Sequence, residues 1–474
     1  MGGLSKIRPA AAALLAAALL CALMLALWWP GVAMYDSVDQ YGQALHGSYD
    51  DWHPPIMARL WSFLLLAWDK QAPMFVLQAI FYWLGLGLIA ASLAREGAGR
   101  AAAAVLALGA LPLFAGWEAA VLKDAQMVGA MLAATGIAGW WRLAGRRLPV
   151  AAGVAVALLL LYASLVRVNA VFAAAPLACG LFGWFGLRRL LARTAILLGL
   201  VGAILLAAPI VNHDILAADE TGIARSLPIF DLAGIAHFGG PEAVPLLPPE
   251  SWRAMEARHC YQPFFWDPLA DPEHCGFVHD DLNDAAEGPA LFRSWAETAL
   301  RHPLAYAGHR LSHWNATLRW LVPRGWPMAA PPDESEPNAL GLAGPGPGGA
   351  AAAELGGWLA ETPLGWPFLW LAAALAALAF ARREQPLAFA LALSAVLLEA
   401  SFALVSISSD LRYHLWPMLA TGLAWVLSAR APLPRGRQAW IAGGLIFVLL
   451  LAGLAARLAL PPAAGTYAAM LSGG

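Results

Sequence analysis

The sequence predicts an all-α polytopic integral membrane protein with about 11 transmembrane helices. Hydrophobic residues make up 60% of its 474 residues, and the mean hydropathy is +0.62, whereas soluble domains are usually about 45–50% apolar. Apolar windows of about 20 residues recur along the chain, and each can span a hydrocarbon core about 30 Å thick. They are rich in Ala and Leu and do not alternate with polar residues, so they indicate helices.

The first apolar segment, 9–29, is expected to be an uncleaved transmembrane helix. Lys6 and Arg8 precede it, as in a signal peptide, but the run exceeds the usual apolar region of about 7–15 residues and no A-x-A site follows. The shorter run 56–68 indicates a re-entrant or interfacial helix. The other expected spans are 74–93, 101–116, 125–141, 149–165, 168–187, 194–212, 364–381, 386–407, 412–428 and 438–460.

The distribution of basic residues predicts a cytoplasmic N-terminus. Fifteen of the 29 Lys and Arg lie in one set of short turns, with only Glu96 and Glu384 among the acids, and cytoplasmic loops are the positive ones. The acidic and His-rich loops then face the periplasm of a bacterial inner (cell) membrane. The net charge of −2 argues against a nucleic-acid partner. The basic residues are Lys6, Arg8, Arg95, Arg100, Arg142, Arg146, Arg147, Arg188, Arg189, Arg193, Arg382, Arg383, Arg430, Arg435 and Arg437.

This map divides the chain into three parts. Residues 1–212 form an N-terminal transmembrane module whose first outer loop, 30–73, is expected to carry the active site. Residues 213–362 form a long periplasmic loop with interfacial helices, and 363–474 are C-terminal transmembrane helices. Within the long loop, 301–323 has too many His and Arg residues to cross lipid and is expected to be an amphipathic interfacial helix. The stretch "GPGPGGAAAAELGG" indicates a flexible linker.

Cys260 and Cys275 lie close together in the long outer loop. The periplasm is oxidising, so we expect a disulfide between them, with two free thiols as the alternative. A metal site fits less well, because the pairs His259-Cys260 and His274-Cys275 lack the usual C-x-x-C spacing. The aromatic run "FFW" between the cysteines could stack on sugar rings or form a small loop core.

Five small polar clusters lie at the outer ends of the expected helices. Ionisable groups are expensive next to lipid and usually face a cavity or a partner. In helix bundles, ligand-binding sites form where the ends of helices distant in sequence meet at one membrane level. We therefore expect the clusters to converge. They are Asp36 with Asp39, His53 before Pro54-Pro55, Lys123-Asp124, Arg167 with Asn169, and Asp410 with Arg412, Tyr413 and His414.

Each cluster also has a simpler structural interpretation, in which its side chains act alone at the membrane boundary. The occurrence of all five on one side favours a common site over these interpretations. The simpler interpretations are a helix cap for Asp36, a plain loop position for His53, local ion pairs for Lys123-Asp124 and Asp410-Arg412, and a charge reaching the membrane surface for Arg167.

Short motifs in this order resemble the GT-C superfamily of membrane glycosyltransferases. They are the acidic first outer loop ending in "HPP", "LKDAQ" at the outer start of a later helix, "VRVNA" opening another, and "SDLRYHLWPML" near the last helices. These enzymes transfer a sugar from a polyprenyl-phosphate carrier on the outer face. The aspartate-glutamate pair of relatives such as the protein O-mannosyltransferases and the aminoarabinose transferase is replaced here by Asp36-Ser37, with Asp39 three residues on.

The resemblance implies inverting hexosyl or pentosyl transfer from a polyprenyl-phosphate donor to a lipid, glycan or protein acceptor. It also implies that the first outer loop, which carries the active site, is GT-C-like. The acceptor hydroxyl needs a base and the leaving phosphate needs cations. No cofactor is expected, although Asp36, Asp124 and His53 could hold Mg²⁺ or Mn²⁺. The expected roles are catalysis for Asp36 as general base, Asp124 and His53; donor phosphate binding for Lys123, Arg167 and Arg412; and substrate binding for Asp39, Asn169, Asp410, Tyr413 and His414.

Two other function classes stay open. An O-antigen-type ligase or polymerase would use a polyprenyl-pyrophosphate glycan at a similar lipid-facing cleft. A non-enzymatic lipid-carrier flippase or transporter would place charges deep along its spans, whereas Glu399 is the exception in these nearly uncharged spans. The sequence leaves the sugar, the acceptor and the length of the carrier lipid open.

Overall fold

The computed structural model describes residues 2–184, 190–286, 288–381, 385–429, 436–464 and 466–471. Over these ranges the regular elements are helices, accompanied by two isolated β-bridges, Val32–Ala120 and Asp50–Asp219. The all-α prediction is confirmed for this part of the chain. Six of the basic turn residues used to orient the chain lie outside the described residues: Arg188, Arg189, Arg382, Arg383, Arg430 and Arg435.

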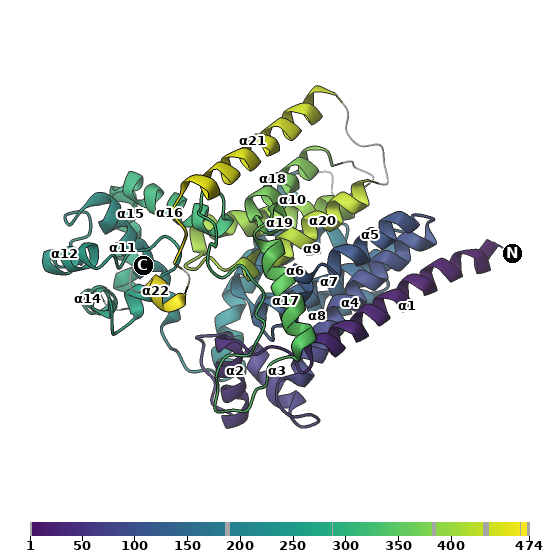
Figure 1. Ribbon diagram of the computed structural model, residues 1–474, viewed down its shortest axis with the longest axis horizontal. Coiled ribbons are helices and arrows are strands. Elements are labelled where there is room, and N and C mark those ends of the chain that lie inside the picture. The colour runs from purple at the N-terminus through teal and green to yellow at the C-terminus, as the bar shows by residue number, and fades with distance from the viewer. Residues whose placement is uncertain are drawn as a thin grey trace.

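Twelve of the described helices form a bundle of roughly aligned segments (Figure 1). The N-terminal end of α1 lies at one end of this bundle, and α2, α3 and the segment α11–α16 lie toward the other end. The bundle helices are α1 (Gly2–Trp28), α4 (Ala72–Arg95), α5 (Gly99–Gly109), α6 (Pro112–Ala119), α7 (Lys123–Arg142), α8 (Val150–Val166), α9 (Val171–Leu181), α10 (Leu190–Pro209), α18 (Pro367–Ala379), α19 (Pro386–Val405), α20 (Leu415–Ser428) and α21 (Arg437–Ala459).

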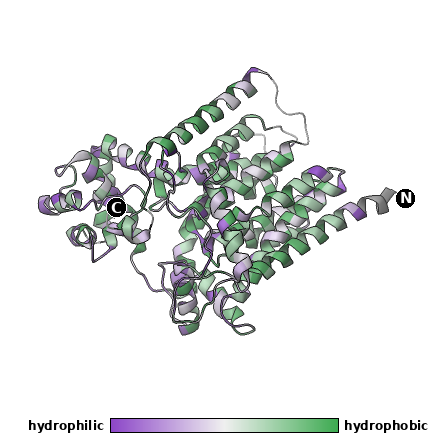
Figure 2. Cartoon of the chain, viewed as in Figure 1, coloured by the Kyte–Doolittle hydropathy of each residue, from purple (hydrophilic) through white to green (hydrophobic). Residues whose placement is uncertain are grey.

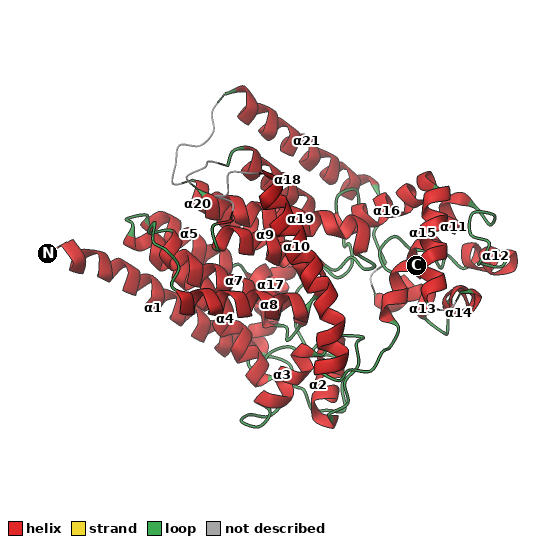
Figure 3. Ribbon diagram, turned by 180° about the vertical axis from the view of Figure 1, so that it is seen from behind, coloured by secondary structure: helices red, strands yellow, loops and turns green. Residues whose placement is uncertain are grey.

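The remaining helices belong to the connections between bundle helices, except α22, which follows α21. Figure 3 shows from behind that α11–α16 form a separate group beyond the bundle, while α2 and α3 lie below it. These helices are α2 (Tyr35–His46), α3 (Ile56–Leu64), α11 (Ser226–Gly239), α12 (Pro249–Ala257), α13 (Asp267–Ala270), α14 (Gly276–Ala285), α15 (Pro289–Arg301), α16 (Pro303–Leu318), α17 (Pro347–Ala360) and α22 (Tyr467–Leu471). Short irregular turns include η1 (Val168–Ala170), η3 (Ile210–Ile215), η4 (Ile223–Arg225), η5 (Pro363–Gly365) and η6 (Leu411–His414).

Five described helices are long and apolar enough to cross a membrane, and a sixth if the bent pair α5–α6 is one span. The apolar side chains of α10 and α21 point outward: Leu191 is 84% exposed and Leu458 is 80% exposed. Exposed apolar side chains of this kind are stable against lipid but not against water. Figure 2 shows hydrophobic residues along the bundle helices. The chain is therefore a multi-pass helical membrane protein, while the expected total of eleven spans stays a prediction. The five spans are Arg8–Trp28, Ala72–Arg95, Leu191–Ile215, Pro386–Val405 and Arg437–Ala459.

A glycine pair sets the close crossing of α4 and α7. A β-carbon at Gly85 would lie 2.3 Å from the carbonyl oxygen of Leu132, and one at Gly136 would lie 2.5 Å from that of Gly85. Small residues let membrane helices approach until their backbones touch. The crossing matters for function because α7 begins with Lys123 and Asp124.

Replacing Gly85 with Val is expected to destabilise the protein by at least about 1–3 kcal/mol, because an overpacked contact must force two backbones apart. Thermal unfolding of the detergent-purified protein measures this loss. Gly443→Val is the matched control, since a β-carbon there meets no atom within 4 Å. Equal melting temperatures for the two variants would contradict the importance of this crossing.

The Gly/Pro/Ala-rich stretch expected to be a linker largely forms a helix, so that prediction is wrong. Most of it belongs to α17, which packs against α1 and α6. A β-carbon at Gly349 would lie 2.6 Å from the carbonyl oxygen of Leu27, and one at Gly356 would lie 2.9 Å from that of Pro112. Glycine is required at these positions because the helix packs closely against its neighbours, and not because the segment is mobile.

Helix α16 occupies most of the segment expected to be an amphipathic interfacial helix. Its polar side chains do not face outward as that expectation required, because His309 and His313 are fully buried and Arg310 is nearly so. Arg310 forms an ion pair of 2.5 Å with Asp231 of α11 and donates a hydrogen bond of 2.8 Å to the Ser406 carbonyl. These contacts hold α16 against α11 and connect it to the end of α19.

Candidate active site

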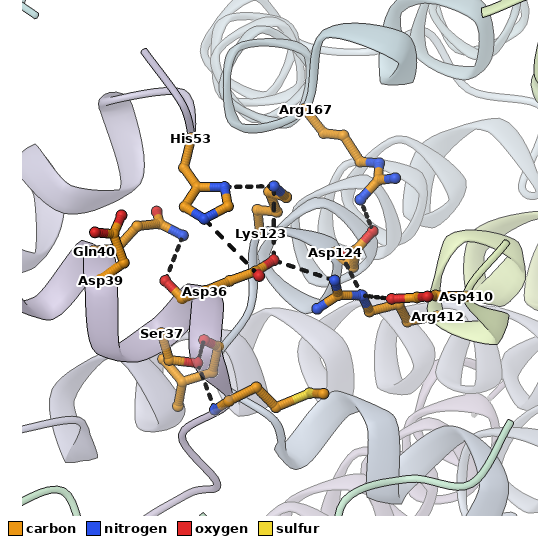
Figure 4. A network of polar contacts seen from close by, with 12 residues as sticks. Asp36, Ser37, Asp39, Gln40, His53, Lys123, Asp124, Arg167, Asp410 and Arg412 are labelled. Atoms are coloured by element: carbon orange, nitrogen blue, oxygen red, sulfur yellow. Dashed lines mark hydrogen bonds and ion pairs between the residues drawn. The ribbon is translucent and has the colours of Figure 1, made fainter. Parts of the chain in front are cut away.

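Residues from all five polar clusters meet at the end of the bundle where α2 joins it (Figure 4). Asp36 comes from the first turn of α2 and His53 from the loop after that helix. Lys123 and Asp124 begin α7, Arg167 precedes η1, and Arg412 belongs to η6 with Asp410 immediately before it. We call Asp36, His53, Lys123, Asp124, Arg167, Asp410 and Arg412 the charge cluster.

Asp36 occupies the centre of the charge cluster. Its Oδ2 lies 3.2 Å from Arg412 Nη2 and 3.7 Å from Lys123 Nζ, and its Oδ1 lies 3.9 Å from His53 Nε2. The side chain is only 13% exposed. Asp36 therefore points into the protein, toward residues that are distant in sequence.

Ser37, not Asp36, secures the start of α2. Its Oγ accepts a hydrogen bond of 3.0 Å from the Met34 N–H and donates one of 2.6 Å to the carbonyl of Val121. The second bond attaches the helix to the segment that leads into α7. The capping interpretation of Asp36 is therefore wrong, because the serine beside it supplies the local contact and leaves the carboxylate available.

Asp124 connects two guanidinium groups beneath Asp36. Arg167 Nη1 donates a hydrogen bond to its Oδ1, and Arg412 Nε lies 3.7 Å from its Oδ2. Only 1% of the Asp124 side chain is exposed. Lys123 and Asp124 are thus not paired with each other; each binds a partner from another part of the chain.

Arg167 turns inward instead of reaching the membrane surface. Besides Asp124, its guanidinium contacts Asn169, whose Oδ1 accepts a hydrogen bond of 3.0 Å from Nε. Its Cζ lies 4.0 Å from the ring centroid of Tyr413, a cation–π contact. Asn169 and Tyr413 therefore position an arginine in this structure.

Arg412 joins three carboxylates. The expected local pair with Asp410 exists, with Nε 2.9 Å from Oδ2. The same guanidinium also contacts Asp36 and Asp124, so the pair is one part of a larger network. A planar guanidinium with several donors suits this bridging position, which an ammonium group would fill poorly.

His53 is a neutral hydrogen-bonding residue here. Its Nδ1 lies 2.7 Å from Lys123 Nζ, and an ammonium group can only donate, so Nδ1 accepts and Nε2 carries the proton. Burial, followed by the charge of Lys123, lowers the pKa of His53 to about 3. The Nε2 proton is directed toward the side of the cluster that holds Asp36.

Asp36 is ionised at neutral pH. Burial by itself would raise its pKa, but the guanidinium of Arg412 and the ammonium of Lys123 outweigh burial and hold the pKa well below its usual range. A carboxylate in this state is a strong electrostatic partner and a weak base. Its basicity depends on whether the surrounding cations have another anion to bind.

Several buried polar atoms of the charge cluster have no hydrogen-bond partner. They are Asp36 Oδ2, His53 Nε2, Asp124 Oδ2 and Arg412 Nε. Buried polar atoms are normally paired, because leaving them unpaired carries a free-energy penalty. These atoms do have ion-pair contacts, the shortest being 2.9 Å from Arg412 Nε to Asp410 and 3.2 Å from Asp36 Oδ2 to Arg412. A polar ligand could add the directed hydrogen bonds that these contacts lack.

The residues do not fit the alternative divalent-cation site. Arg412 lies between Asp36 and Asp124, and the carboxylates already have basic partners. Across the described ranges, no group of three or more His, Cys, Asp or Glu side chains has the arrangement of a metal site. Hard cations need several free oxygen ligands directed at one point, and Asp36, Asp124 and His53 do not provide them.

Two of the expected substrate-binding residues are bonded to side chains outside the charge cluster. The His414 side chain is fully buried, with Nδ1 2.8 Å from both carboxylate oxygens of Glu399, so it is paired inside the protein and its role in substrate binding stays a prediction. Asp39 points away from Asp36 in Figure 4 and accepts a hydrogen bond of 2.9 Å from Gln43. It lines a separate polar cavity of about 460 Å³ with Asp50 and Asp219.

The long segment between α10 and α18 contains a disulfide between Cys260 and Cys275, whose Cα atoms are 5.8 Å apart. Phe264 and Phe265 between them are 3% and 2% exposed, and they pack with Met470 from the end of the chain. Of the two interpretations of this aromatic run, the loop core is correct for both phenylalanines. Their burial leaves no ring face free to stack on a sugar.

Two buried or partly buried acids were not identified from the sequence. Asp267 accepts a hydrogen bond of 2.7 Å from the Tyr467 hydroxyl, and neither residue has a local pattern that would indicate the contact. Glu118 of α6 is 1% exposed, and both of its carboxylate oxygens lack a hydrogen-bond partner. It lies just beyond the apolar run 101–116, so the span boundary concealed it.

Comparisons with known proteins find little. No protein-family model matches the chain, and no curated protein matches it. A solved structure of the archaeal oligosaccharyltransferase AglB from Archaeoglobus fulgidus, in complex with an inhibitory peptide and a dolichol-phosphate, is similar over 98% of this chain and 55% of that one. The sequence identity is 14% and the TM-score is 0.37. The chain thus spans about half the length of that protein.

Proposed function

We propose that this protein is a GT-C-type membrane glycosyltransferase that moves a sugar from a polyprenyl-phosphate donor to an acceptor hydroxyl. The observation that carries the proposal is the position of Asp36, whose carboxylate lies between Arg412 and Lys123 and faces His53. This combination provides a base for the acceptor and cations for a phosphate in one place. The site would face the periplasm of a bacterial inner membrane, where the acceptor is a lipid, a glycan or a protein.

The cations of the charge cluster suit a phosphate leaving group. Lys123, Arg167 and Arg412 face Asp36, Asp124 and Asp410, so the formal charges cancel before a donor binds. A donor phosphate adds negative charge next to these cations, and more negative charge develops on its oxygens as the sugar leaves. Preorganised cations in a partly buried site stabilise that charge more than water does.

Donor binding would also make Asp36 a better base. Arg412 and Lys123 keep the pKa of Asp36 low, and a phosphate that binds the same cations offsets their effect on the carboxylate. The proton affinity of Asp36 therefore rises when the donor is in place.

The acceptor hydroxyl would bind between Asp36 and His53. An oxygen beside both side chains could accept the Nε2 proton of His53 as a hydrogen bond and donate its own proton to Asp36 Oδ1. As the acceptor oxygen bonds to the anomeric carbon, its proton moves to Asp36 and the bond to the phosphate oxygen breaks with its electron pair. Attack opposite the phosphate inverts the anomeric centre, and this chemistry needs no metal.

The proposal is tested on the purified full-length protein in lipid nanodiscs. Mass spectrometry of extracted lipids is expected to identify a co-purified polyprenyl-phosphate sugar, and supplied donor is expected to release polyprenyl phosphate when acceptor is added. EDTA should leave this rate unchanged. Recovery of a polyprenyl-pyrophosphate glycan would favour the ligase or polymerase instead. Movement of intact donor across vesicles without loss of sugar would favour a transporter.

A further inference from the structure

A corner of the long outer segment lies beside the charge cluster. The Trp266 N–H donates a hydrogen bond of 3.0 Å to the carbonyl of Ile407, three residues before Asp410. The indole rings of Trp266 and Trp52 have centroids 6.2 Å apart, and Trp52 immediately precedes His53. The Trp266–Asp267 corner is therefore held between the two loops that contribute His53 and Asp410 to the site.

This corner presents the two kinds of group that bind a saccharide ring. The Trp52 side chain is 42% exposed, so much of its indole is available for contact. Asp267, the first residue of α13, has an Oδ2 atom that accepts a hydrogen bond from a hydroxyl. Apolar faces of sugars pack on aromatic rings, and sugar hydroxyls donate to carboxylates.

The hydroxyl now bound to Asp267 belongs to the C-terminal segment of the same chain. Tyr467 Oη donates to Asp267 Oδ2 at 2.7 Å, and the Tyr467 side chain is half exposed. The segment is further held by a hydrogen bond from Gln262 Nε2 to the Met470 carbonyl and by burial of Met470 against Phe265. The Tyr467 ring also lies edge-on to Phe265, with centroids 5.7 Å apart. Because these contacts are made outside the bundle helices, a ligand with better contacts could displace the tyrosine without unfolding the bundle.

We propose that Asp267 and Trp52 form a binding subsite for a saccharide acceptor, and that the Tyr467 phenol occupies the place of an acceptor hydroxyl. The inference rests on the proposed glycosyl transfer and adds the acceptor class, a hydroxyl-rich sugar ring of a glycan or glycolipid. Asp267 binds the acceptor in this scheme, while Asp36 remains the base. The C-terminal segment 466–471 competes with the acceptor for Asp267.

The titration of Asp267 supplies a second signature. Burial raises the pKa of Asp267 to about 6; the Tyr467 hydrogen bond opposes this rise, the nearby Asp410 and Asp36 add to it, and Arg412 opposes it. A protonated carboxyl accepts a hydroxyl hydrogen bond less well than a carboxylate does. Saccharide binding to the donor-free protein should therefore weaken as the pH drops through about 6, since without donor Asp36 stays ionised there and His53 stays neutral.

Two variants of opposite sign test the subsite. Asp267→Asn is expected to raise the acceptor KM about 10- to 100-fold, as for loss of a hydrogen bond to a charged group, with donor KM unchanged and the pH dependence of saccharide binding near pH 6 lost. Tyr467→Phe removes the competing hydroxyl and is expected to lower the acceptor KM about 2- to 10-fold. Asp280→Asn is the matched control, because Asp280 lies in the same outer segment and its side chain is 73% exposed.

A binding experiment keeps this inference separable from the proposed function. Saturation-transfer NMR with methyl glycosides of common hexoses and pentoses requires no donor and no turnover. Contacts with wild-type protein that weaken in Asp267→Asn and strengthen in Tyr467→Phe support the subsite even if transfer is never observed. Failure of transfer with intact saccharide binding would count against the proposed function alone.

Three outcomes would overturn the subsite. The first is equal loss of donor and acceptor binding in Asp267→Asn, with protease resistance of the outer segment also lost; Asp267→Glu, which keeps the charge, would then be no better than Asn. The second is an increase in acceptor KM in Tyr467→Phe, which would make the tyrosine part of the site instead of its competitor. The third is saturation of the enzyme by a Ser/Thr peptide with no response to any glycoside.

Discussion

Replacing Asp36 with Asn is expected to lower sugar transfer by about 10²–10⁴-fold, the contribution of a positioned general base. Asn has nearly the same shape as Asp but cannot take the acceptor proton. The substitution also leaves Arg412 and Lys123 without the anion that now lies 3.2 Å and 3.7 Å from them. An anionic donor should therefore bind the variant at least as tightly as the wild type.

This pair of effects, slower transfer with undiminished donor binding, separates a base from a residue that merely stabilises the fold. The measurements are single-turnover rates with bound donor and the donor Kd in nanodiscs. Asp69→Asn is the matched control, because Asp69 is an exposed carboxylate of the same outer loop. Wild-type rates in Asp36→Asn would remove Asp36 from the mechanism, and parallel losses of rate and donor binding would assign it to the donor site.

Replacing Arg412 with Ala is expected to lower both stability and donor binding. The guanidinium is the shared partner of Asp36, Asp124 and Asp410 and is only 9% exposed. Removing one member of a buried ionic network leaves uncompensated charge, which costs about 3–5 kcal/mol. The donor phosphate would at the same time lose a bridging cation and meet an excess of carboxylates.

Arg412→Lys distinguishes charge from geometry at this position. Lys restores the positive charge, but a single ammonium cannot bridge three carboxylates as a planar guanidinium does. We expect stability to recover in part and donor affinity to recover less. Thermal unfolding in detergent and donor Kd measure the two effects, with Arg301→Ala as control, since the Arg301 side chain is 71% exposed and its ion pair is with the half-exposed Glu297. Wild-type stability in Arg412→Ala would contradict the network.

The opposing charges of the cluster also explain why acidic and basic residues occur at helix ends beside lipid. A lone ionisable group there would be costly, but the charged members have oppositely charged neighbours, most of them supplied by another segment of the chain. Asp124 is an example: its carboxylate is almost fully buried, and it receives Arg167 on one oxygen and Arg412 near the other. The arrangement keeps cations available for an anionic ligand without exposing them to the membrane.

The all-helical fold class and the membrane setting follow from sequence alone, because both depend on local properties. An apolar run of sufficient length must satisfy its backbone within itself in lipid, and this makes a helix. The convergence of Asp36, His53, Lys123, Arg167 and Arg412 could also be anticipated, since their positions at helix ends restrict them to one membrane level. The disulfide could be expected from the position of Cys260 and Cys275 in one outer loop.

Only the tertiary structure decided which of these groups touch. Asp36 binds Arg412 from nearly the other end of the chain, while His414, two residues beyond Arg412, turns toward Glu399 instead. The glycines of α17 pack a helix instead of loosening a linker, and Tyr467 returns to Asp267. Local composition predicts a helix because its hydrogen bonds are local, whereas ion pairs and close packing depend on the distance between segments that only the folded chain brings together.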